Sequence, residues 1–148
     1  MTTKQFLPLP YGKDVYSELK VNGCYFVDKT PYLKDIIDKD KSNVMLFTRP
    51  RRFGKTLFMS MVEYFLKINS ANPGDTTLQQ KLFKDTKILD DQEFCAKYMG
   101  QHPVICLTLK GVYGKTFTSA YYKLAELIVA KAKEYSFLKD SQNLNDKE

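Results

Sequence analysis

The segment from Val44 to Thr56 constrains the fold of this chain more than any other. It begins with the apolar run Val44 to Phe47, continues as a basic loop and reaches Gly54-Lys55-Thr56. An apolar pattern with helical spacing follows over residues 57–66. A buried strand, a loop, Gly-Lys-Thr and a helix in that order are typical of phosphate-binding loops. The segment therefore predicts an α/β fold with a nucleotide site where the strand meets the helix.

The residue types in this loop suit a triphosphate and a magnesium ion. The start of a helix presents backbone N–H groups and the positive end of its dipole to an anion. Gly54 lets the backbone approach a phosphate, the Lys55 ammonium reaches the β- and γ-phosphates, and the Thr56 hydroxyl is a ligand for Mg²⁺. We therefore predict ATP and Mg²⁺ as cofactors, with Thr56 as the metal ligand. The predicted ATP-binding residues are Arg49, Pro50, Arg51, Arg52, Phe53, Gly54, Lys55, Thr56 and Leu57.

One position departs from the usual pattern of such loops. The general motif has a glycine five positions before its second glycine, and this chain has Arg49 there. Pro50 partly replaces the tight turn of the missing glycine because its ring fixes φ. The positive charges of Arg49, Arg51 and Arg52 suit a polyphosphate.

The same loop also fits a nucleic acid. Between Lys41 and Val62 there are five cations and no acidic residue, and the chain carries a formal net charge of +6. Such a segment can neutralise backbone phosphates without a dedicated nucleotide site. The alternative function is therefore a nucleic-acid-binding module that uses the basic loop at residues 49–55.

A second Gly-Lys-Thr, at residues 114–116, competes for the same role. It also follows an apolar run, residues 104–109, and precedes a helical pattern. Its structural interpretation is a loop in which Thr116 or Thr118 caps the next helix. The additional arginines favour the first site, but the local pattern leaves the second open.

Composition and cysteine usage limit the class of protein. A length of 148 residues is enough for about one domain with its own core. No apolar stretch has transmembrane length, and the first residues lack the pattern of a signal peptide. The three widely spaced cysteines, Cys24, Cys95 and Cys106, argue against a disulfide framework or a zinc site. We therefore predict a cytoplasmic protein that does not contact a membrane.

The remaining patterns complete an α/β layout. Helices are expected over residues 14–21, 32–37, 77–83, 91–99 and 117–135, and further strands over 25–27 and 104–109. Residues 1–12 are predicted as an extended entry, and the polar residues 139–148 as a disordered tail.

These motifs together resemble the AAA-ATPase-like family of bacterial and archaeal proteins. Tyr25-Phe26-Val27-Asp28-Lys29-Thr30 and Phe47-Thr48-Arg49-Pro50-Arg51-Arg52-Phe53-Gly54-Lys55-Thr56 match its signature, and the resemblance covers residues 7–137. In that family Arg49 is the usual residue at its position, not a sign of decay. The resemblance implies a P-loop ATPase-like protein, with the N-terminal portion of a three-layer αβα sandwich as its fold. Many members continue into a nuclease-like domain of the PD-(D/E)XK type.

Two landmarks of the family are missing from this sequence. Members typically have a later strand ending in Leu-Ile-Asp-Glu-Tyr-Asp, whose acids help to hold Mg²⁺ and prepare the attacking water. The nearest candidate, Ile88-Leu89-Asp90-Asp91, is better interpreted as a turn in which Asp90 or Asp91 caps a helix. The nuclease-like region, a possible site for nucleic acid, is also missing. We therefore expect residues 1–148 to be the N-terminal part of a longer ATPase-like protein, with no catalytic residue, weak ATP binding and no hydrolysis on its own. Its incomplete sheet would leave an edge through which copies could associate.

Other candidates for chemistry are weaker. His102 is the only histidine and precedes Pro103, so it is interpreted as structural. The Tyr121-Tyr122 pair is interpreted as core packing rather than as a base-stacking surface. Asp28 and Lys29 match the family motif, and both a base-contacting and a packing role stay open for them.

Overall fold

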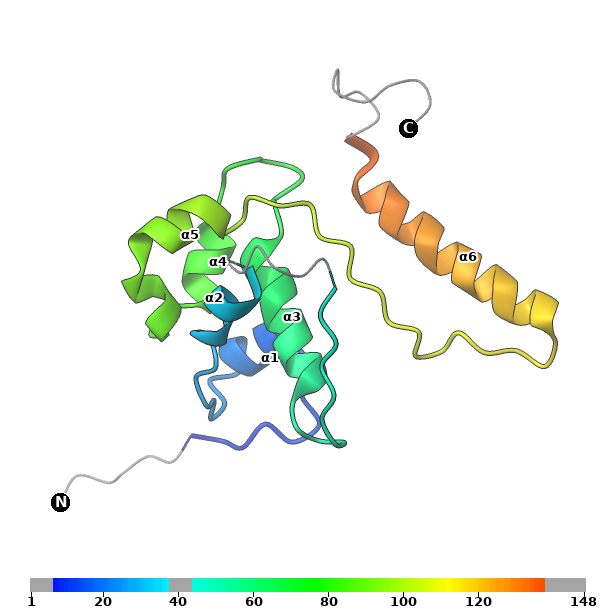
Figure 1. The fold of residues 1–148 in the computed structure, drawn as a ribbon, viewed down its shortest axis with the longest axis horizontal. Coiled ribbons are helices and arrows are strands. Elements are labelled where there is room, and N and C mark those ends of the chain that lie inside the picture. The colour runs from blue at the N-terminus through cyan, green and yellow to red at the C-terminus, as the bar shows by residue number, and fades with distance from the viewer. Residues whose placement is uncertain (1–6, 38–43, 138–148) are drawn as a thin grey trace.

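The computed structural model describes residues 7–37 and 44–137, and within these ranges the chain is helical (Figure 1). The N-terminal part of residues 1–12 and all of residues 139–148, predicted as an extended entry and a tail, lie outside the described residues. The elements are α1 (Tyr16–Val21), α2 (Tyr32–Ile37), α3 (Lys55–Leu66), α4 (Thr77–Leu82), the 3₁₀ helix η1 (Lys87–Asp90), α5 (Gln92–Tyr98) and α6 (Phe117–Glu134).

The predicted three-layer αβα sandwich is wrong for the described part of the chain. No β-strand is formed there, and the nearest feature is an isolated parallel bridge between Lys67 and His102. The predicted strands at 25–27, 44–47 and 104–109 are extended segments without a ladder, and Leu46 and Ile105 are 85% and 68% exposed.

The physical reason for this difference is that no ladder forms between the described segments. A strand persists when a neighbour satisfies its backbone hydrogen bonds and the sheet packs on an apolar face. Within the described ranges, neither of the apolar segments 44–47 and 104–109 is part of a β-ladder. Since there is no sheet in these ranges, the sheet edge expected to mediate self-association is absent from them as well.

The core lies between α3 and the short helices packed around it. Phe65 of α3, Tyr16 of α1 and Phe83 beyond α4 are fully buried, and the Phe83 ring contacts those of Tyr16 and Phe65 with centroids 4.9 and 5.3 Å apart. The Tyr16 hydroxyl donates to the carbonyl of Leu82 at 3.2 Å, so its polar atom is satisfied inside the core. Burying each such side chain contributes about 1.5–3 kcal/mol. This cluster therefore fixes the position of α3 and of the loop that precedes it.

Helix α5 begins where the sequence predicted a cap. The Asp91 carboxylate accepts a hydrogen bond from the Phe94 N–H at 3.0 Å and forms an ion pair with Lys34. The interpretation of Ile88 to Asp91 as a turn with an N-cap is confirmed, because residues 87–90 form η1 and Asp91 is the cap. The backbone of His102 bonds to Leu66 and Ile68 next to the isolated bridge, and the structural interpretation of its side chain stays a prediction.

Helix α6 differs from the other helices because it buries none of its residues. Figure 1 shows it apart from the helical body, beyond the extended segment that follows α5. The interpretation of Tyr121 and Tyr122 as core residues is therefore wrong: their side chains are 57% and 63% exposed.

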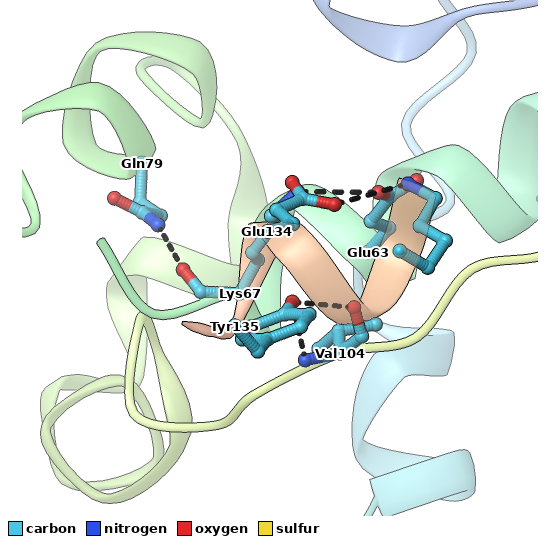
Figure 2. A network of polar contacts seen from close by, with 7 residues as sticks. Glu63, Lys67, Gln79, Val104, Glu134 and Tyr135 are labelled. Atoms are coloured by element: carbon cyan, nitrogen blue, oxygen red, sulfur yellow. Dashed lines mark hydrogen bonds and ion pairs between the residues drawn. The ribbon is translucent and has the colours of Figure 1, made fainter. Parts of the chain in front are cut away.

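The C-terminal end of α6 takes part in a network of polar contacts with the end of α3, which Figure 2 shows. The Tyr135 hydroxyl accepts from the Val104 N–H at 2.9 Å and donates to the Val104 carbonyl at 2.5 Å. Lys67, the C-cap residue of α3, pairs with both Glu63 and Glu134. The Lys67–Glu134 ion pair ties the end of α6 to the body, and the Tyr135 bonds join that end to the start of the same arm, residues 103–137.

Candidate functional site

The nine predicted site residues form one continuous stretch at the start of α3. Residues 49–53 make up the basic loop, Gly54 is the N-cap of α3, and Lys55 to Leu57 form its first turn. Because α3 buries Met61 and Phe65 in the core, this turn belongs to a helix that is anchored in the core. The arginines at 49, 51 and 52 are exposed.

The sign of the backbone angle φ alternates along the loop. φ is positive at Arg52 (65°) and at Gly54 (74°), and it is not positive at Arg51 or Phe53. Alternation of this kind turns successive backbone N–H groups toward one side of the chain and creates a concavity for an anion. A positive φ at arginine costs about 1–2 kcal/mol relative to glycine, and strain of this kind is concentrated at functional sites.

Lys55 closes the loop on itself. Its ammonium donates to the carbonyl of Arg49 at 2.6 Å and to the carbonyl of Pro50 at 2.9 Å. These bonds span five and six residues, so they hold the two ends of the basic loop together. The charged group thus lies at the mouth of the loop and not in free solvent.

The first turn of α3 has backbone N–H groups that are not bonded to any described part of the protein. Within the described residues, no protein group accepts from the N–H groups of Lys55, Thr56 or Leu57, and the Gly54 cap has no side chain to do so. The turn also contains no acidic residue. Unpaired donors, the positive end of the helix dipole and the absence of a carboxylate all favour an anion here.

The fit of the site to Mg²⁺ rests on the Thr56 hydroxyl. This group is exposed at the second position of α3, and Mg²⁺ prefers oxygen ligands and keeps several waters. No cluster of three or more His, Cys, Asp or Glu residues suited to a metal occurs in the described ranges. The residues present therefore fit a metal held mainly by phosphate oxygens and water, with one protein ligand.

Two cavities flank the basic loop and share a wall. The first, of about 370 Å³, lies between the loop, α3 and the segment 25–29, and its lining includes Tyr25, Phe26 and Leu57. The second, of about 360 Å³, lies toward α2 and includes Tyr32, Arg49 and Lys55. Their shared lining consists of Lys29, Phe53, Gly54 and Phe58.

Asp28 and Thr30 hold the segment beside these cavities in place. One Asp28 oxygen accepts from the N–H and the hydroxyl of Thr30, at 2.9 and 2.7 Å, and the other accepts from the Lys87 N–H at 2.9 Å. The Thr30 hydroxyl, fully buried, accepts from the Ile88 N–H at 3.2 Å. Burial by itself would raise the pKa of Asp28, but the hydrogen bonds from Lys87 and Thr30 hold it below its ordinary value. The packing role left open for Asp28 is therefore the one observed.

Lys29 is the residue that sequence reasoning left without a role. It stands between the two members of this clasp, is exposed, and lines both cavities. The available signal was its place inside the Asp-Lys-Thr motif, but a motif does not say which way a side chain points.

The second Gly-Lys-Thr is built differently. The Thr116 side chain accepts from the Ser119 N–H at 3.2 Å, and the Ser119 hydroxyl contacts the Thr116 N–H in return, which forms a capping box. The structural interpretation of Thr116 as a helix cap is confirmed. In Figure 1 this end of α6 lies well away from the start of α3, so the structure does not bring the two tripeptides together.

Comparison with known proteins gives one match. A model of the AAA-ATPase-like family, described as predicted AAA-ATPase, matches residues 10–148. Neither the curated proteins nor the solved structures contain a match. Among the described helices, none has both the length and the apolar character required to cross a membrane. Since the family model spans nearly the whole sequence, the chain belongs to the AAA-ATPase-like family.

Proposed function

We propose that this chain binds a nucleoside triphosphate, ATP in the first instance, through residues 49–57. The observation that carries the proposal is the backbone of the loop: alternating φ signs at 51–54 run into a first helical turn whose N–H groups have no protein acceptor in the described ranges. Such a concavity recognises the tetrahedral oxygens of a phosphate through main-chain donors.

The side chains supply charge around those donors. Lys55 closes the loop and Arg49, Arg51 and Arg52 surround it, so four cations lie within seven residues. Arginine suits phosphate because its planar group can donate two parallel hydrogen bonds. In the complex, the Thr56 hydroxyl would hold Mg²⁺ together with phosphate oxygens, and the ion would neutralise part of the triphosphate charge.

Magnitudes place the affinity in the micromolar range or weaker. A Kd of 1 µM corresponds to about 8 kcal/mol, and a charge-assisted hydrogen bond contributes about 1.5–3 kcal/mol. Four or five such bonds would supply this free energy, before the cost of ordering the loop and the ligand is subtracted. The two bonds from Lys55 to loop carbonyls already order part of the loop and reduce that cost.

We propose binding without turnover by residues 1–148 alone. Hydrolysis of a triphosphate needs a group that positions the attacking water, and usually an acid that helps to hold the metal. In the described ranges, the acid that lines either cavity is Asp35, on the α2 side, and Asp90 and Asp91 belong to η1 and the α5 cap. ATP turnover that Lys55→Ala abolishes would contradict this part of the proposal.

The test is a titration of the purified chain with MgATP. We expect Lys55→Ala to abolish detectable binding and Arg51→Ala to weaken it only about fivefold, because one surface charge contributes less than about 1 kcal/mol. Lys115→Ala is the matched control: it removes a lysine from the other Gly-Lys-Thr and should leave the affinity unchanged.

Nucleic-acid binding through the exposed arginines is the outcome that would replace this proposal. In that case affinity for a DNA duplex would fall steeply with salt, and Arg52→Ala would cost as much affinity as Lys55→Ala.

A cytoplasmic location is also proposed, on the basis that all three cysteines are free thiols.

A further inference from the structure

The two cavities beside the basic loop have different chemical characters. The first is lined by nine apolar or aromatic residues in addition to Lys29, Arg52 and Gly54, and no acid lines it. The second is lined by five apolar or aromatic residues together with Arg49, Lys55 and the carboxylate of Asp35. An apolar hollow with a few polar groups at its rim is the usual form of a small-ligand site, and 370 Å³ lies within the range of such sites.

Both cavities border the proposed phosphate position, because Gly54 and Phe53 line each of them. Lys55 and Arg49, the residues at the mouth of the basic loop, line only the second cavity. The phosphate chain therefore has its charge partners on the second side. A nucleobase attached to it has an apolar hollow within reach on the first side.

We propose that the first cavity receives the nucleobase and that Lys29 contacts the nucleotide between base and phosphates; this deepens the proposed function and rests on it. The exposed ring of Tyr25 and the half-exposed ring of Phe26 supply flat apolar surface to the cavity, and Arg52 supplies a cation that can stack on a base. The ligand class is a nucleoside triphosphate, as opposed to a bare polyphosphate.

Lys29 is suited to this role because its neighbours are fixed. Asp28 is bonded to the Lys87 N–H, and Thr30 is buried and bonded to the Ile88 N–H. The backbone on each side is therefore anchored to η1, while the Lys29 side chain lies on the wall that both cavities share. A cation at this place meets the ribose and the α-phosphate of a nucleotide that spans the wall.

The experiment compares MgATP with magnesium tripolyphosphate, which has the phosphates but no base. We expect ATP to bind about tenfold more tightly, since stacking of a base on an aromatic side chain is worth about 1–3 kcal/mol and 1.4 kcal/mol is tenfold. Tyr25→Ala should remove about fivefold or more of the ATP affinity and leave that for tripolyphosphate unchanged. Lys29→Gln should weaken both ligands, and its thermal unfolding should match that of the unmodified chain because the side chain is exposed.

Tyr32→Ala is the matched control, because Tyr32 is an exposed tyrosine that lines only the second cavity. It should leave the ratio of the two affinities unchanged. Equal affinities for ATP and tripolyphosphate, both abolished by Lys55→Ala, would overturn the base site and keep the proposed function. If Tyr32→Ala but not Tyr25→Ala lowered the ratio of ATP affinity to tripolyphosphate affinity, the base would lie in the second cavity and the proposed base site would be overturned. Failure of both ligands to bind would overturn both proposals.

Discussion

The two Gly-Lys-Thr sequences of this chain are identical in letters and opposite in use. At residues 54–56, glycine is the cap and the backbone donors of the next turn have no protein acceptor in the described part of the chain. At residues 114–116, threonine is the cap and a serine three positions later completes a capping box. One helix start is left open to an anion, and the other is closed by its own side chains.

The helices behind the two tripeptides differ as much as their caps. Helix α3 buries Met61 and Phe65 in the core, whereas α6 buries no residue and is tied to the body through the ion pair of Glu134 with Lys67. A site that must hold its geometry when a ligand binds needs the first kind of support. A tripeptide therefore gains its meaning from the cap residue and from the packing of the helix that follows it.

The largest expected effect tests this difference in support. Phe65→Ala should lower the free energy of unfolding by about 3–5 kcal/mol, because it leaves a cavity among buried aromatic rings. Ile128→Ala on the exposed surface of α6 should cost less than about 1 kcal/mol. Urea denaturation of the two variants measures both. Similar costs would contradict the division between body and arm.

The second test concerns the clasp that holds residues 28–30 beside the loop. Asp28→Asn should destabilise the body by about 1–3 kcal/mol, because an amide cannot accept from Thr30 and Lys87 at the same time without opposing a donor to a donor. The stabilisation by the Asp28 carboxylate depends on pH. The folded pKa of Asp28 is lowered, so its contribution is complete above the unfolded pKa and is lost as pH falls through the folded one.

The difference in unfolding free energy between Asp28→Asn and the unmodified chain should therefore shrink from pH 7 toward acid. Chemical denaturation at several pH values gives this difference directly. A gap that stays constant, or that widens in acid, would show that the carboxylate does not stabilise the fold in its charged form.

The third test replaces the threonine of each Gly-Lys-Thr separately by alanine. Thr116→Ala should destabilise α6 by about 1 kcal/mol because it removes an N-cap. Thr56→Ala should leave the stability of α3 nearly unchanged, because its side chain makes no cap bond in the structure. Hydrogen exchange of the amides in each helix distinguishes the two effects, because it reports protection separately for each segment. Equal loss of protection in both helices would remove the contrast between the two starts.

The smallest effect concerns the strained backbone of the loop. Arg52→Gly should raise stability by about 1 kcal/mol or less, because glycine accepts the positive φ at that position without strain. Arg51→Gly removes the same charge where φ is not positive, so it should lower stability by a similar amount. Thermal unfolding compares the pair, and a gain for Arg51→Gly alone would contradict the alternating backbone.

Local chemistry was predictable from the sequence, and long-range pairing was not. The helix that begins at Lys55, the Asp91 cap and the Thr116 cap follow from residue types at fixed offsets. The strands failed because Val44 to Phe47 and residues 104–109 have strand composition, yet strand formation depends on a partner that local pattern does not supply. For the same reason Tyr121 and Tyr122 were misplaced, since helical periodicity identifies a face without saying what covers it.

The residues of the candidate site were predictable from the sequence, but the cavities around them were not. Residues 49–57 are contiguous, so their proximity follows from the chain itself. The cavities beside them, and the position of Lys29, depend on the clasp between Asp28, Thr30 and the start of η1, about 58 positions later. Contacts of such sequence separation leave no periodic signal in one sequence.

The most direct test of the central claim follows the backbone amides of ¹⁵N-labelled protein during a titration with MgATP. We expect the amide resonances of Gly54 to Leu57 to shift progressively, while those of Gly114 to Ser119 stay in place. Shifts confined to residues 114–119, or no shift at either helix start with millimolar ATP, would contradict it.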